Sequence, residues 1–214
     1  MTALSKAEEV EIAQAAISAL GKIQHTAALP PLLIALRAPL PQRRLDAIRA
    51  LGLHKEAETV QALQEQISVE EDFSVIQAAF EVLAQIGSAQ AIAALISLAV
   101  APYRRDLGIE VLSQLNEDKI PIIAEEGLHH PHLRARSVTV EALARMRHPL
   151  ATQCLLVALT DKEILVRLAA VKAFEQLNYR GASQGLSVLA NRDPNPAVRR
   201  AAQRVLKHQT AEHI

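Results

Sequence analysis

Seven polar or charged residues recur at one place in a repeated helical pattern, two residues before a regularly spaced leucine or phenylalanine. This polar column consists of Ser18, Arg49, Glu81, Glu110, Glu141, Lys172 and Arg204. If the helices line a groove, central carboxylates would accept N–H groups of a ligand, and cations at the edges would bind its carboxylates. A solvated helix face without a ligand is the alternative interpretation.

A second column contains arginine at five of the seven places, seven residues before the same positions. Its members are Arg44, Arg105, Arg136, Arg167 and Arg199. Five aligned guanidinium groups could bind an anion. We favour a structural role, because such side chains can reach carbonyl or acidic acceptors in the preceding connection, such as Asp161 or Asp193, and join one repeat to the next.

Two further clusters have chemical potential. Tyr103, Arg104 and Asp106 form a compact polar group with Arg105 at a junction between repeats, where an exposed side chain could contact a ligand. The histidines of HHPHLR are interrupted by a proline and lack a cysteine or carboxylate at helical ligand spacing, so we predict no metal site. Glycine-rich phosphate loops, nucleophile elbows and paired cysteines are not found in the sequence.

The elements that position these residues are helices, as a repeated apolar pattern indicates. The anchor positions have spacings of 29 to 32 residues and are Leu20, Leu51, Leu83, Leu112, Leu143, Phe174 and Leu206. Small residues stand four positions earlier, as close packing of two helices requires: Ala16, Ala47, Ala79, Gly108, Thr139, Ala170 and Ala202. Twelve residues after the first six anchors, a second apolar series marks a second helix: Leu32, Leu63, Leu95, Ala124, Leu155 and Leu186.

This pattern predicts an all-α fold, an α-solenoid of the HEAT-like or armadillo type with about six two-helix repeats and a terminal helix. We expect a single domain over residues 1–214, with 208–214 as a tail that could fray. Gly21, Gly52 and Gly87 lie near helix ends, where glycine readily adopts a left-handed conformation.

Composition restricts the partners and the compartment. The 23 basic and 23 acidic residues balance, so we expect no nucleic-acid partner. No segment approaches the roughly 20 apolar residues of a membrane span, and the acidic N-terminal segment does not resemble a signal peptide. The single Cys154 excludes an internal disulfide and fits a reducing compartment. We therefore expect a cytoplasmic protein.

The repeats, above all VRLAAVKAFEQL and DPNPAVRRAAQRVL, resemble the HEAT-like repeats of cyanobacterial phycobilisome lyases of the E/F type. The short array is most similar to the smaller, beta or F-type subunit of phycocyanobilin lyase. The resemblance implies a carbon–sulfur lyase that attaches phycocyanobilin to a cysteine of the phycocyanin alpha subunit through a thioether, with reverse transfer also possible. It implies activity only with a larger HEAT-like partner subunit, and phycocyanobilin as a substrate in place of a permanently bound cofactor.

For such a ligand, Glu110 and Glu141 are the candidate catalytic carboxylates, because pyrrole N–H groups need an acceptor. Arg104, Arg145 and Lys172 are candidates for binding the propionates, and Tyr103 and Asp106 for further bilin contacts. No cysteine-containing motif of an isomerising relative is present, so we expect attachment without isomerisation. The alternative function is a non-catalytic HEAT-repeat adaptor, such as a phycobilisome-degradation protein.

Overall fold

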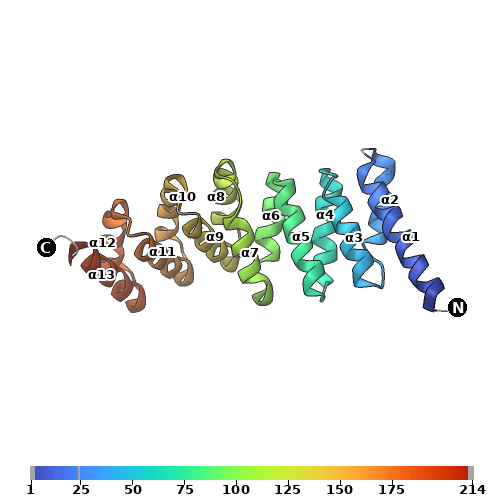
Figure 1. Ribbon diagram of the computed structural model, residues 1–214. Coiled ribbons are helices and arrows are strands. Elements are labelled where there is room, and N and C mark those ends of the chain that lie inside the picture. The colour runs from blue at the N-terminus through green and yellow to red at the C-terminus, as the bar shows by residue number, and fades with distance from the viewer. Residues whose placement is uncertain (1–2, 24, 212–214) are drawn as a thin grey trace. The chain divides into compact units, whose positions relative to one another are not determined.

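The structure is a computed structural model that describes residues 3–23 and 25–211, with the side chains of residues 11–23 and 25–210. These residues form thirteen α-helices and five short 3-10 helices, and no strand occurs among them. The helices pair as six two-helix repeats followed by α13, so the prediction of an all-α solenoid is confirmed (Figure 1). The chain divides into two compact units, Met1–Leu98 and Ala99–Ile214. The expectation of a single domain stays a prediction.

The first unit contains three helical pairs. Its first helices α1, α3 and α5 pack in sequence, and each is followed by its second helix. The bounds are α1 Ala3–Lys22, η1 Thr26–Ala28, α2 Leu29–Ala35, α3 Pro41–Leu51, α4 Ala57–Val69, α5 Phe73–Ile86 and α6 Ala89–Leu98.

The second unit contains three more pairs and the terminal helix, and its first helices α7, α9, α11 and α13 again pack in sequence. The bounds are η2 Pro102–Arg104, α7 Arg105–Ser113, η3 Glu117–Lys119, α8 Ile120–Leu128, α9 Leu133–Met146, α10 Pro149–Cys154, η4 Leu155–Thr160, α11 Ile164–Leu177, η5 Arg180–Ala182, α12 Ser183–Arg192 and α13 Pro196–Ala211. The segment expected to fray is therefore helical through Ala211, and residues 212–214 lie outside the described part.

The repeated apolar positions form the cores of both units. The five internal anchors, from Leu51 to Phe174, are fully buried, whereas Leu20 and Leu206 in the first and last helices are half-buried. All six residues of the second series are buried. A single two-helix repeat cannot bury its apolar stripe alone. Stacking of neighbouring repeats within each compact unit therefore provides the driving force for this fold.

Two of the three glycines near helix ends serve close packing instead of a left-handed turn. Gly87 has a φ of 59°, as expected for a left-handed helix end. Gly52 instead has helical torsions, and a Cβ there would lie 3.2 Å from a methyl group of Val82. A Cβ at Gly21 would lie 2.8 Å from the Cβ of Ala50. These two glycines therefore allow one first helix to approach the next.

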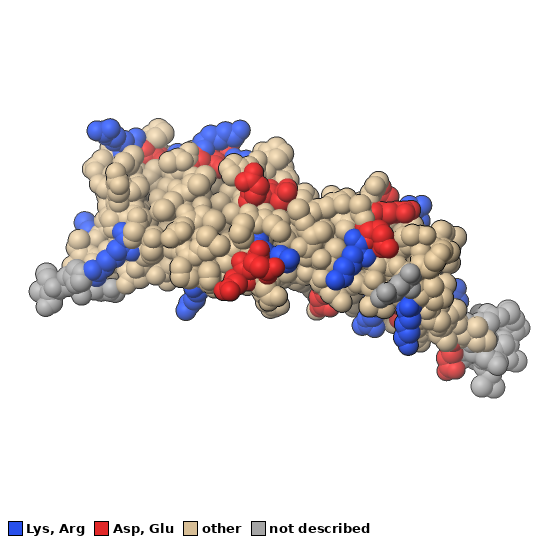
Figure 2. Space-filling model, turned by 90° about the horizontal axis from the view of Figure 1, so that it is seen from above, with Lys and Arg blue, Asp and Glu red and all other residues tan. Residues whose placement is uncertain are grey.

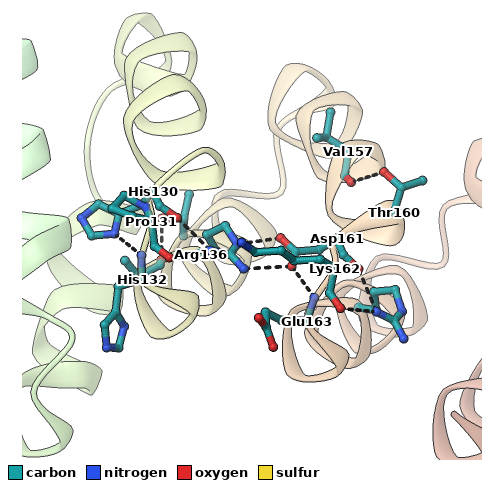
Figure 3. A network of polar contacts seen from close by, with 12 residues as sticks. His130, Pro131, His132, Arg136, Val157, Thr160, Asp161, Lys162 and Glu163 are labelled. Atoms are coloured by element: carbon teal, nitrogen blue, oxygen red, sulfur yellow. Dashed lines mark hydrogen bonds and ion pairs between the residues drawn. The ribbon is translucent and has the colours of Figure 1, made fainter.

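The predicted structural role of the arginine column is confirmed at four positions, with carbonyl acceptors in the preceding connection as expected. The paired acids instead lie in the connection that follows the repeat. Arg136 at the start of α9 donates to both carboxylate oxygens of Asp161, at 2.7 and 3.0 Å, and to the carbonyls of His130 and Pro131 (Figure 3). Arg167 makes the same contacts with Asp193 and with two carbonyls before α11. Arg44 pairs with Glu70, an acceptor that we did not predict. Arg199 donates to the carbonyls of Asp193 and Pro194.

One second helix differs from the expected regular α-helix. The second apolar series places Leu155 within a second helix, but α10 ends at Cys154 and the chain continues as the 3-10 helix η4. Leu155 and Ala158 are both buried, at the spacing of three residues that one 3-10 turn brings onto the same side.

The surface charge is mixed. Figure 2 shows acidic and basic side chains interspersed over the face that it presents, with uncharged surface between them. Among the described residues, no helix combines the length and the apolar character that crossing a membrane requires.

Candidate functional site

Arg105 is the member of the arginine column that departs from the common arrangement. In the other pairs, arginine and acid lie 25 or 26 residues apart, as in Arg136 with Asp161 and Arg167 with Asp193. The same spacing from Arg105 falls on His130 and Pro131, which carry no carboxylate. Arg105 instead forms an ion pair with Glu141 of α9. Because no acid stands 25 or 26 residues after Arg105, its guanidinium pairs with a residue of the polar column instead.

The Arg105–Glu141 pair lines a groove of about 490 Å³ that runs over the first helices of the second unit. This volume lies within the roughly 300–1,000 Å³ typical of small-molecule sites. Lys172 and Arg134 complete its charged lining, and Ser137 adds a hydroxyl. The remaining lining is apolar and consists of Val100, Pro102, Leu133, Leu165, Leu168 and Ala169. The groove, called the α9 groove below, joins an apolar surface to a small set of charges.

The charges of the α9 groove sum to plus two, since Arg105, Arg134 and Lys172 face a single carboxylate, that of Glu141. Arg105 donates to Oε1 of Glu141, and no other described residue donates to this carboxylate. Lys172 and Arg134 are exposed, and neither forms an ion pair with another described residue. Two cations therefore remain available for an anionic ligand, and Arg105 holds Glu141 in place.

Helix geometry explains why Glu141 and Lys172 meet. Both belong to the polar column, and their helices α9 and α11 pack side by side. Positions that occupy the same place in two stacked helices point toward the same surface. The column thus predicted the relative placement of these two residues.

The other candidates lie outside the lining of the α9 groove. Glu110 is exposed on α7, and Arg145 is exposed on α9 beyond Glu141. Tyr103 is 64% exposed, and the guanidinium of the buried Arg104 lies 4.7 Å from its ring centroid. Asp106 is exposed, with its carboxylate 3.6 Å from Arg105. The structure therefore brings together Glu141 and Lys172 and leaves the remaining candidates at the periphery.

Sequence reasoning missed Arg134 and Ser137 of the groove, and it named Arg105 in the polar group at the repeat junction without proposing it as a ligand contact. Arg105 was assigned to the structural column. The absence of an acid 25 or 26 residues after it was the signal that could have separated it from Arg44, Arg136 and Arg167.

The histidines of HHPHLR cap the backbone. Nδ1 of His132 accepts from the N–H of Arg134 at 3.1 Å, and Nδ1 of His130 accepts from the N–H of His132. No group of three or more metal-ligating side chains occurs in the described part of the chain. Cys154 is partly buried, and burial raises the pKa of its thiol, which disfavours a nucleophilic thiolate.

This arrangement is suited to binding and orientation. An apolar ligand body can rest on the leucines, a carboxylate group can pair with Lys172 or Arg134, and an N–H group can donate to Glu141.

The chain belongs to the HEAT-repeat family, because a model described as HEAT repeats matches residues 29–113 and 123–207. A second model, described as PBS lyase HEAT-like repeat, matches residues 12–38. No curated protein matches the chain.

Several solved structures are similar to the chain. Human deoxyhypusine hydroxylase is 19% identical, over 93% of this chain and 79% of that one, with a TM-score of 0.45. The complex of CpcE and CpcF of phycocyanin lyase from Nostoc is 25% identical, over 92% and 82% of the two chains, with a TM-score of 0.41. An archaeal HEAT-like repeats protein from Thermococcus onnurineus is 18% identical over 99% of both chains, with a TM-score of 0.41.

Proposed function

We propose that this chain is the smaller, F-type subunit of a heterodimeric bilin lyase. It would attach phycocyanobilin to a cysteine of the phycocyanin alpha subunit, together with a larger HEAT-like subunit and in the cytoplasm. One observation carries the proposal: the α9 groove is apolar and has a net charge of plus two. An open-chain tetrapyrrole has an apolar conjugated body and two propionates, which matches both properties. The PBS lyase repeat over residues 12–38 supports the same class of activity.

In this proposal the lyase orients the bilin, and the acceptor protein supplies the reacting thiol. The sulfur bonds to the ethylidene carbon of the bilin, and the proton of the thiol is transferred to the ring carbon of the former double bond. No oxidant or reductant is needed. The reverse elimination releases the bilin. Holding the two reactants in a productive geometry accounts for the rate enhancement.

Each polar residue of the α9 groove has a role in binding. Lys172 and Arg134 pair with the propionates, because they are the two cations of the groove that form no ion pair with another described residue. Glu141 accepts from the pyrrole N–H groups through the carboxylate oxygen that Arg105 does not use. Arg105 is a positioning residue, since it acts on the bilin through Glu141.

The test is reconstitution of bilin transfer. The chain is co-expressed with phycocyanobilin, apo-phycocyanin alpha subunit and larger HEAT-repeat lyase subunits in turn, with CpcE and CpcF among them. Zinc-induced fluorescence of the denatured acceptor measures the covalent adduct. We expect an adduct with at least one partner; its absence in every combination would contradict the lyase function and favour a non-catalytic adaptor.

Variants then test the α9 groove. We expect Lys172→Gln and Glu141→Gln each to lower transfer roughly tenfold to a hundredfold, since a hydrogen bond to a charged group is worth about 1.5–3 kcal/mol. Lys55→Gln and Glu58→Gln make the same chemical changes at exposed sites in the first unit and should leave transfer unchanged. Circular dichroism and the melting temperature serve as controls for folding. Equal losses in the groove and control variants would place the bilin elsewhere.

A further inference from the structure

Helix α1 exposes a face that the later first helices bury. Ile12 is 64% exposed, and Ala16 and Ala19 are exposed as well. At 100° per residue these three side chains lie within one narrow sector of the helix. The opposite side of α1 carries Ile17 and Gly21, which are buried where α1 packs on its neighbours in the first unit. This exposed face is called the stacking face below.

The equivalent positions are covered wherever a first helix follows another within the same unit. Ala47, Ala79, Thr139, Ala170 and Ala202 correspond to Ala16, and all five have no exposed surface. Ala50, Val82, Ala142, Ala173 and Val205 correspond to Ala19 and are buried. Val75, Ala135, Val166 and Val198 correspond to Ile12 and are at most 1% exposed, and the fifth equivalent, Arg43 of α3, is partly buried. The stacking face thus continues an interface that the chain forms five times internally.

The occupant of this interface is known from the internal repeats. It is the preceding first helix, as in the contacts between α1 and α3 and between α9 and α11. Gly21 of α1 lies against Ala50, and Gly52 of α3 lies against Val82, so a small residue meets the position equivalent to Ala19. A large aliphatic residue four positions earlier, Ile17 or Ile48, is buried on the same side as each glycine. A helix with this pattern is the complement of the stacking face.

The last helix of the chain does not offer that pattern. Val198, Ala202 and Val205 of α13 are buried, but its other side carries Arg200, Gln203 and Lys207, all exposed. The position of Gln203 is aliphatic and buried in earlier first helices, for example Val140 and Val171. A polar outer face is typical of the terminal repeat that ends a solenoid. Head-to-tail stacking of two copies would bury Arg200 and Lys207 against Ile12, Ala16 and Ala19, which offer no compensating charge.

We infer that the stacking face is a docking surface for the end helix of another HEAT-repeat chain, one whose outer face is apolar where that of α13 is polar. The partner helix would place an aliphatic residue and a small residue, four positions apart, against Ala16 and Ala19. This inference rests on the proposed function for the identity of the partner, which would be the larger lyase subunit. The docking itself requires no bilin chemistry.

The experiment makes such an end helix from the chain itself. The full-length triple variant Arg200→Ser, Gln203→Val and Lys207→Ala gives α13 the outer residues of α9, which are Ser137, Val140 and Ala144. Sedimentation velocity measures its mass across a concentration series. We expect concentration-dependent head-to-tail association of the triple variant and none of the wild-type chain. Adding Ala16→Glu, which lies on an exposed helix surface, should weaken the association at least tenfold.

Ser18→Glu is the matched control, because Ser18 is exposed on α1 outside the stacking face and should leave association intact. Two outcomes would overturn the inference: a triple variant that stays monomeric, or association that Ala16→Glu does not weaken. Wild-type dimers that Ala16→Glu dissociates would also overturn it, since a second copy would then be the occupant. Sedimentation is measured without bilin, so failure of bilin transfer alone would contradict the lyase function and leave docking supported.

Discussion

At the scale of single residues, one arginine–acid arrangement recurs in both units. Arg44, Arg136 and Arg167 each reach an acid 25 or 26 residues later and two carbonyls before their own helix. Each guanidinium thereby joins two successive connections. Because solenoid stability resides in contacts between neighbouring repeats, these arginines act at the positions where stability is determined.

Removing one of these arginines should be costly. The side chains of Arg136 and Asp161 are 6% and 11% exposed, so Arg136→Met leaves a buried carboxylate without its partner. We expect the free energy of unfolding in chemical denaturation to fall by about 3–5 kcal/mol. Arg204→Met removes a solvent-exposed pair with Glu175 and should lower the free energy of unfolding far less. Similar losses for both variants would mean that burial of the Arg136 pair contributes nothing.

The acids of these pairs also predict acid sensitivity. Burial acts to raise the pKa of Glu70, Asp161 and Asp193, but the hydrogen bonds from the arginines and from backbone N–H groups outweigh it. All three carboxyl pKa values therefore lie below their ordinary range. A depressed carboxyl pKa contributes stability above the unfolded-state pKa of about 4, and this contribution is lost as pH falls toward the folded-state pKa.

His130 shifts stability in the same direction, because burial lowers its pKa. The unfolded chain then binds this proton first as pH falls below about 6.5. We expect the free energy of unfolding to decrease slightly between pH 7 and 5 and steeply below pH 5. Denaturation with urea at several pH values measures this profile. Asp161→Asn should flatten its acid limb, and a profile that does not change would contradict the assignment.

At the scale of helices, the sizes of two facing residues are matched where α8 of the fourth repeat packs against α9 of the fifth. Thr139 of α9 is the largest member of the small-residue series, and Gly127 of α8 lies against it. A Cβ at Gly127 would overlap the hydroxyl and methyl groups of Thr139. The threonine is therefore accommodated because its neighbour has no side chain.

Gly127→Ala should destabilise the second unit by about 1–3 kcal/mol, as overpacking of a dense core does. Thr139→Ala removes the two atoms nearest to the added methyl group. We therefore expect Gly127→Ala with Thr139→Ala to recover part of the loss, with a favourable coupling energy in a double-mutant cycle measured by thermal unfolding. Strictly additive losses would show that the two positions are not in contact.

At the scale of the whole molecule, the chain combines a binding groove in one unit with an exposed stacking face in the other. Of the polar column, only Glu141 of α9 and Lys172 of α11 line the α9 groove. The stacking face uses α1, the first helix among the described residues of the first unit. Since each repeat of a solenoid contacts only its neighbours, changes at Ala16 should leave the local structure of the α9 groove intact.

The sequence by itself determined the class of fold, because seven anchors such as Leu143 and Phe174 recur with one helical pattern that must be buried by stacking. It also determined that Glu141 and Lys172 share a surface, since equivalent positions of stacked helices point the same way. Only the tertiary structure decided which residues form the α9 groove, because that depends on contacts between residues far apart in the chain. Arg105 pairs with Glu141, 36 residues away, and Glu110 of the same column lies outside the lining. Ile12 is exposed for the same kind of reason: its environment depends on whether another helix precedes α1, and its own residue type does not specify that.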